Sequence, residues 1–100
     1  MLLDTLNYSS VEGSRNDKDI VIYSLSTCGF CKRAMTYLKD KGFSYRYIHL
    51  DQTPLETKSE VKRLLKASFN EDVAFPFAVI DKESYLVGFI EEDWKRTLGL

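Results

Sequence analysis

The stretch that decides the fold is residues 20–31, which read Ile20-Val21-Ile22-Tyr23-Ser24-Leu25-Ser26-Thr27-Cys28-Gly29-Phe30-Cys31. Residues 20–25 form a short run rich in β-branched side chains, which is typical of a strand covered on both faces in a parallel sheet. From Cys31 onward the apolar residues recur at intervals of three and four, at Ala34, Met35 and Leu38, which predicts an amphipathic helix. The two cysteines are therefore expected at a strand-to-helix turn.

The rest of the chain continues the alternation of strands and helices. Residues 43–50 are rich in aromatics and predict a second strand, parallel to the first through a right-handed crossover. Thr53-Pro54-Leu55-Glu56 has the order of a capping box, with Pro54 at the first position of a second helix. Residues 77–80 and 85–87 predict a hairpin. A last helix follows, with Ile90, Trp94 and Leu98 on its buried side.

This order, βαβαββα, predicts an α/β two-layer sandwich in which helices pack on a four-stranded mixed sheet, and it is similar to the thioredoxin architecture. A chain of 100 residues can bury one hydrophobic core, so we expect a single domain over residues 19–100. Residues 1–18 are predicted to be an N-terminal extension, because residues 12–19 have the composition of a linker. The extension is expected either as a short docking helix or as a loosely ordered tail.

Composition restricts the partners of the chain. Fourteen basic residues nearly balance fifteen acidic ones, which gives no strong field toward nucleic acid or a membrane surface. The sequence has no run near the roughly 18 apolar residues of a transmembrane helix, and its start does not resemble a signal peptide. We therefore expect a cytoplasmic monomer.

The two cysteines carry the chemistry. Disulfide exchange needs an attacking thiolate and a second thiol that resolves the mixed disulfide. Cys28 at a helix N-terminus is favoured as the thiolate by the free N–H groups and the helix dipole, and Cys31 lies on the same helix face as the resolving thiol. Half of a zinc site is the alternative for this spacing, but the chain has no further cysteine and one histidine, His49, so we expect no metal. His49 is interpreted as a strand residue, with a role as catalytic base as the alternative.

Three segments carry a family resemblance. Residues 23–34 resemble the active-site segment of glutaredoxins, Phe75-Pro76-Phe77 resembles the segment around their cis-proline, and Gly88 resembles the glycine after their hairpin. The resemblance covers about residues 20 to 98. It implies that Pro76 follows a cis peptide bond and that the main chain of Phe75 pairs with a peptide or glutathione. A trans proline that opens the third strand is the alternative.

The same resemblance implies a substrate site and shows where this chain departs from the family. Besides Phe75 and Pro76, the residues expected there are Thr27, Phe30, Gly88 and Phe89. Phe30, Phe75 and Phe89 are expected either as an apolar rim or as ordinary core. Many glutathione-using members have a lysine at the position of Leu25 and a glycine at the position of Phe89, so both departures alter the glutathione site.

The departures leave the electron donor open. Gly88-Phe89 and residues 42–51 resemble the glutaredoxin-like redoxins of class Ib ribonucleotide reductase, which thioredoxin reductase recharges. The Gly-Phe pair of Cys28-Gly29-Phe30-Cys31 is shared with monothiol glutaredoxins. The donor is therefore expected to be either thioredoxin reductase or glutathione, and the client a disulfide-containing protein, with ribonucleotide reductase as one candidate.

The sequence thus predicts an enzyme, a glutaredoxin-like thiol-disulfide oxidoreductase that carries electrons to protein disulfides or glutathione mixed disulfides without a bound cofactor. One alternative is a binding module of the monothiol-glutaredoxin type, in which Cys28 and a glutathione thiol ligate an iron-sulfur cluster across a dimer. A second alternative is an adaptor that uses only its surface.

Overall fold

The computed structural model describes residues 2–100 and contains five strands, three α-helices and two 3-10 turns. Their order is η1 (Leu2–Asp4), β1 (Ser9–Val11), β2 (Ile20–Ser24), α1 (Gly29–Asp40), β3 (Tyr45–His49), η2 (Leu50–Gln52), α2 (Leu55–Phe69), β4 (Phe77–Ile80), β5 (Ser84–Val87) and α3 (Glu91–Thr97). The chain has the thioredoxin-like α/β fold expected from the sequence. None of the helices within residues 2–100 is long and apolar enough to cross a bilayer.

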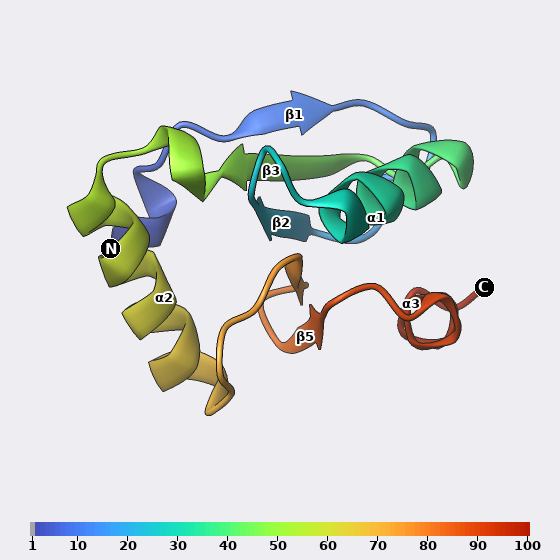
Figure 1. Cartoon of the computed structure of the whole chain (residues 1–100). Coiled ribbons are helices and arrows are strands. Elements are labelled where there is room, and N and C mark those ends of the chain that lie inside the picture. Colours follow the sequence, from blue (N-terminus) through green and yellow to red (C-terminus); the bar gives the residue numbers. More distant parts are fainter. Residues whose placement is uncertain (1) are drawn as a thin grey trace.

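The sheet is mixed and has the strand order β1-β3-β2-β4-β5 (Figure 1). Strands β2 and β3 are parallel, and every other pair is antiparallel. The expectation of four strands is wrong, because β1 pairs with the outer edge of β3 and makes a fifth. Ser9–Val11 is too short and too polar to show the alternation by which strands are recognised in a sequence. The pairing gives hydrogen-bond partners to backbone N–H and C=O groups on the outer edge of β3, which would otherwise face solvent.

The sheet separates two apolar cores. Ile20 and Ile22 point to one face, where they pack with the helices α1 and α3. Val21 and Tyr23 point to the other face, where they pack with α2. Figure 1 shows α2 apart from α1 and α3. The uninterrupted apolar run of β2 follows from this arrangement, because both of its faces are covered.

Two local predictions are wrong. Thr53 does not cap α2: its hydroxyl donates to the carbonyl of Leu50 at 2.7 Å, and Pro54 occupies the cap position, so the helix begins one residue later than expected. Ile90 is 60% exposed because it forms the cap position before α3, whereas Trp94 and Leu98 are buried as predicted. Both differences arise at helix starts, where one residue of shift changes the direction of a side chain.

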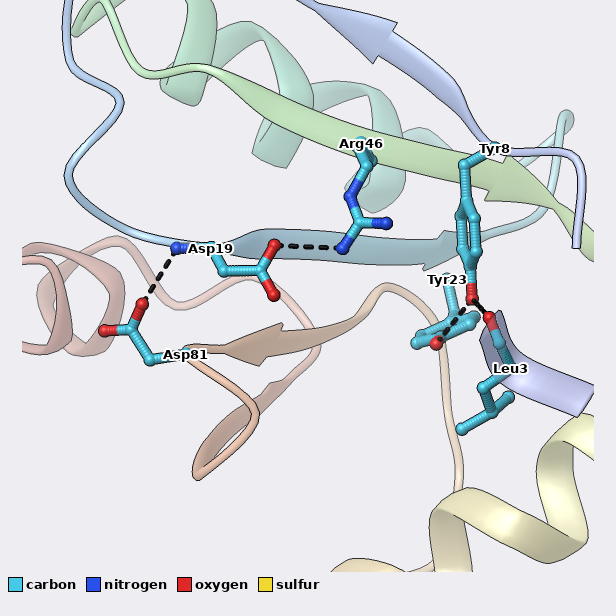
Figure 2. Close-up of polar contacts among 6 residues, drawn as sticks. All are labelled: Leu3, Tyr8, Asp19, Tyr23, Arg46 and Asp81. Atoms are coloured by element: carbon cyan, nitrogen blue, oxygen red, sulfur yellow. Dashed lines mark hydrogen bonds and ion pairs between the residues drawn. The ribbon is translucent and has the colours of Figure 1, made fainter. Parts of the chain in front are cut away.

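The N-terminal stretch is fastened to the sheet by polar contacts that Figure 2 shows. The hydroxyl of Tyr8 donates to the carbonyl of Leu3 at 2.7 Å and lies 3.0 Å from the hydroxyl of Tyr23. The Arg46 guanidinium lies over the Tyr8 ring, 5.2 Å from its centre, and pairs with Asp19 at 2.9 Å. Residues 3–19 therefore add both a strand and side-chain contacts to the domain.

Candidate active site

Cys28 is the N-cap residue of α1, at the end of the turn that leaves β2. Its own N–H donates to the carbonyl of Leu25 at 3.1 Å, which closes the turn. Its sulfur accepts a hydrogen bond from the N–H of Cys31 at 3.2 Å. Cys28 is half-buried, whereas Cys31, one helical turn further on, is fully buried. The two thiols are free, and the first faces solvent more than the second.

A cis peptide bond joins Phe75 and Pro76, as the resemblance to glutaredoxins implied, so the alternative of a trans proline is wrong. The carbonyl oxygen of Phe75 lies 3.8 Å from the sulfur of Cys28. The carbonyl of Pro76 accepts a hydrogen bond of 2.9 Å from the N–H of Gly88, whose φ of 73° suits a glycine. In turn, the indole N–H of Trp94 donates to the carbonyl of Gly88 at 3.0 Å. The fold thus brings together three segments that are far apart in the sequence.

The three phenylalanines expected near the site differ in their surroundings. Phe30 is 58% exposed, and the guanidinium of Arg33 lies 5.6 Å from its ring centre. Phe75 is half-buried and packs against the core on the α2 side. Phe89 packs between Tyr37 and Trp94, with ring centres 5.6 and 5.4 Å away. Phe30, which lies between the two cysteines in the sequence, is therefore the exposed ring. Phe75 packs against the core on the α2 side of the sheet, and Phe89 packs against the core on the α1 and α3 side.

The remaining candidate residues flank the cysteine turn. Thr27 is exposed directly before Cys28. Leu25 is half-buried and packs with the α2-side core. An apolar side chain that contacts the core therefore occupies the position where many glutathione-using relatives carry a lysine.

The thiol of Cys31 has a distinct environment. Burial raises its pKa, and its hydrogen bond to the Cys28 sulfur acts in the same direction. Hydrogen bonds from the backbone of Leu25 and from the side chain of Ser24 oppose this rise. Cys31 therefore stays protonated over a wider pH range than an exposed cysteine.

Asp51 forms hydrogen bonds with Ser26 in the turn that precedes Cys28. The sequence analysis did not identify Asp51 as a site residue. Its carboxylate accepts hydrogen bonds from both the N–H of Ser26, at 2.9 Å, and the hydroxyl of the same residue. These bonds lower the pKa of Asp51, and the nearby His49 adds a smaller effect in the same direction. The sequence held one signal that could have identified Asp51. Neighbouring parallel strands end at the same edge of a sheet, so residues that follow β3 lie beside residues that follow β2.

His49 lies at the carboxyl end of β3, as predicted, with its Nδ1 atom 3.2 Å from the hydroxyl of Ser24. Within residues 2–100 no three His, Cys, Asp or Glu side chains gather in an arrangement that could hold a metal ion.

Comparisons with known proteins agree with this geometry. A family model described as glutaredoxin matches residues 20–84, which include both cysteines and Pro76. The chain belongs to the glutaredoxin family. No functionally curated protein matches it significantly.

Solved structures of glutaredoxins and of a methanoredoxin are similar to this chain over most of its length. The glutaredoxin of Methanosarcina mazei Go1 is 27% identical, with a TM-score of 0.79 over 95% of this chain and 90% of that one. The methanoredoxin of Methanosarcina acetivorans is 32% identical, with a TM-score of 0.76 over 88% of this chain and 90% of that one. A glutaredoxin of Archaeoglobus fulgidus is 26% identical, with a TM-score of 0.69 over 82% and 87% of the two chains. Family and structure together support a thiol-disulfide oxidoreductase.

Proposed function

We propose that this glutaredoxin is a dithiol electron carrier that reduces disulfides of client proteins, with Cys28 as the attacking thiol and Cys31 as the resolving thiol. The observation that carries the proposal is the position of the Cys28 sulfur, half-exposed at the start of α1 and bonded to the N–H of Cys31. A helix N-terminus favours a thiolate over a thiol, and the thiolate is the nucleophile in disulfide exchange.

The reaction proceeds in two exchanges. The Cys28 thiolate attacks one sulfur of a client disulfide, and the other client sulfur leaves with the electron pair of the broken bond. Cys31 then attacks Cys28, a disulfide forms between the two cysteines, and the second client sulfur leaves. The carbonyl of Phe75, 3.8 Å from the Cys28 sulfur, marks the side on which the backbone of a client strand would pair. No bound cofactor takes part.

An external donor must return the two electrons, and we propose a flavoprotein of the thioredoxin reductase class over glutathione. The support is the apolar Leu25, which provides no cation for a glutathione carboxylate, and the ring of Phe89, which fills space where many relatives have a glycine. Gly88-Phe89 resembles the corresponding pair in the glutaredoxin-like redoxins of class Ib ribonucleotide reductase, so ribonucleotide reductase is a candidate client.

The test is NADPH-coupled reduction of insulin, a protein disulfide substrate, with thioredoxin reductase in one assay and with glutathione plus glutathione reductase in the other. We expect turnover in the first assay, its loss in Cys28→Ser, and its loss in Cys31→Ser, because the resolving step is then blocked. Wild-type protein that is inactive in both assays, or a Cys28→Ser variant that matches wild type, would overturn the proposed function. Faster turnover with glutathione would overturn only the choice of donor.

A further inference from the structure

A groove of about 300 Å³ lies between the sheet, the C-terminal half of α2 and the N-terminal stretch. Its floor contains Val21 of β2 and Val79 of β4, which are directly opposite each other in the antiparallel register. Both side chains are short, and Val79 is only half-buried although β4 is an inner strand of the sheet. Apolar surface near the centre of the sheet therefore remains accessible to a ligand.

The walls of the groove are apolar and partly aromatic. Leu65 and Phe69 line it from α2. Leu3 and Tyr8 line it from the N-terminal stretch, where the Tyr8 hydroxyl bonds the Leu3 carbonyl (Figure 2). An apolar cavity of about 150 Å³ accommodates benzene, so this groove has room for a larger ring system.

Charged residues of the lining gather where β2 begins and β4 ends. Asp19 precedes β2, and Arg46 of β3 pairs with its carboxylate at 2.9 Å (Figure 2). Lys82 lies in the turn after β4 and forms no ion pair with any residue in the range 2–100. The neighbouring Asp81 carboxylate accepts a hydrogen bond of 2.8 Å from the N–H of Asp19. The other carboxylate of the lining, Asp4 on η1, makes a contact of its own.

We propose that this groove binds a small aromatic monocarboxylate. The ring of the ligand lies on Val21 and Val79, and its carboxylate pairs with Lys82 at the rim. Contact with the two valines removes apolar surface of both the ring and the floor from water, which drives binding. This binding site goes beyond the proposed function, because it involves no electron transfer.

The lining also selects the class of ligand. Tyr8 and Phe69 favour an aromatic body over an aliphatic one, because contacts between aromatic rings contribute more than their buried area alone. A carboxylate is favoured over an amine, because Asp19 is already paired with Arg46 while the Lys82 ammonium is available to an anion.

The groove is distinct from the cysteine site. The described residues that line it include none of the turn 24–31 and neither Phe75 nor Pro76. Binding in the Cys28→Ser variant should therefore equal binding in wild type. Ligand binding by a protein that reduces no disulfide would refute the proposed function and support this site.

The experiment is a titration of the full chain, labelled with ¹⁵N, with 2-naphthoate as the probe. We expect saturable shifts of the amide signals of residues 21, 79 and 65–69, with a dissociation constant of about 1 mM or lower. Naphthalene-2-methanol has the same ring without the charge and should bind several-fold more weakly, and 2-naphthylmethylammonium should bind most weakly. Shifts that do not saturate, or that lie outside the groove, would overturn the site. An ammonium that binds as tightly as the acid would overturn the assigned ligand class.

Three variants test the two parts of the site. Lys82→Asn removes the cation at a position whose φ of 61° asparagine tolerates, and it should weaken binding of naphthoate about fivefold without affecting the neutral alcohol. Val79→Phe fills the floor and should weaken both probes by roughly tenfold or more. Lys62→Gln, at an exposed lysine of α2 outside the groove, is the control and should bind as wild type does.

The exposed Lys82→Asn change keeps the test decisive even if Val79→Phe lowers stability. Equal affinity of wild type and Lys82→Asn for naphthoate would refute the pairing of the carboxylate with Lys82. Undiminished binding by folded Val79→Phe would refute the position of the ring.

Discussion

The N–H of Ser26 donates a hydrogen bond of 2.9 Å to one carboxylate oxygen of Asp51, while the Ser26 hydroxyl bonds the other oxygen. One side chain that follows β3 therefore fixes the turn that follows β2. This turn carries Cys28 into α1, so the position of the reactive sulfur depends on a carboxylate from the neighbouring strand.

Replacement of Asp51 by Asn should lower the urea midpoint of unfolding at pH 7. Because the Ser26 bonds lower the pKa of Asp51 in the folded state, its contribution is present above the ordinary carboxyl range and is lost as pH falls through the folded value. The difference between wild type and variant should therefore narrow toward pH 3. Asp17→Asn, at another exposed carboxylate, serves as the control, and a difference that stays constant with pH would contradict this account.

Alkylation should distinguish the two thiols. Burial raises the pKa of Cys31, and its sulfur is shielded, whereas Cys28 is half-exposed. Iodoacetamide at neutral pH should therefore modify Cys28 alone, and the Cys28→Ser variant should react far more slowly than wild type. Mass spectrometry of tryptic peptides measures both sites, and labelling of Cys31 at a rate comparable to Cys28 would show that the buried position is wrong.

Gly13 should tolerate no side chain. A Cβ atom there would lie 2.4 Å from the carbonyl oxygen of Gly42, because the N-terminal stretch crosses the end of α1 at close range. We expect Gly13→Ala to destabilise the fold by about 1–3 kcal/mol through overpacking.

The matched control is Gly29→Ala, where a Cβ atom would meet nothing within 4 Å. That change lies in the first turn of α1 and should alter the free energy of unfolding by less than about 1 kcal/mol. Equal effects of the two substitutions in urea titrations would contradict the close approach at Gly13.

Tyr8 should contribute to stability through its hydroxyl. That group bonds the Leu3 carbonyl and lies 3.0 Å from the Tyr23 hydroxyl, which is itself largely buried. Tyr8→Phe keeps the ring contacts and should cost about 1 kcal/mol, because it removes one partner from each of these groups. The measurement is the free energy of unfolding, and a Tyr8→Phe variant as stable as wild type would show that water replaces the hydroxyl at no cost.

The central βαβ unit was readable from the sequence because its signals are local. The apolar run 20–25 ends at a turn, and the three-and-four spacing from Cys31 to Leu38 follows at once, so strand, turn and helix are each specified by neighbouring residues. The helix α1 indeed covers Gly29–Asp40, and the cis bond before Pro76 matches the family pattern. The edge strand β1 was not predicted, because its three residues are too few to show the alternation of apolar and polar side chains that is typical of a strand.

The sequence by itself determined the fold class, the strand-to-helix position of Cys28 and Cys31, and the helices that cover the sheet, since periodicity and turn residues act over a few positions. Only the tertiary structure decided which distant groups meet those cysteines. The carbonyl of Phe75 lies beside the Cys28 sulfur, and the carboxylate of Asp51 bonds Ser26 in the turn that leads to Cys28; both contacts depend on strand order and register. Pairing between strands depends on contacts across the whole chain, so no local pattern specifies it.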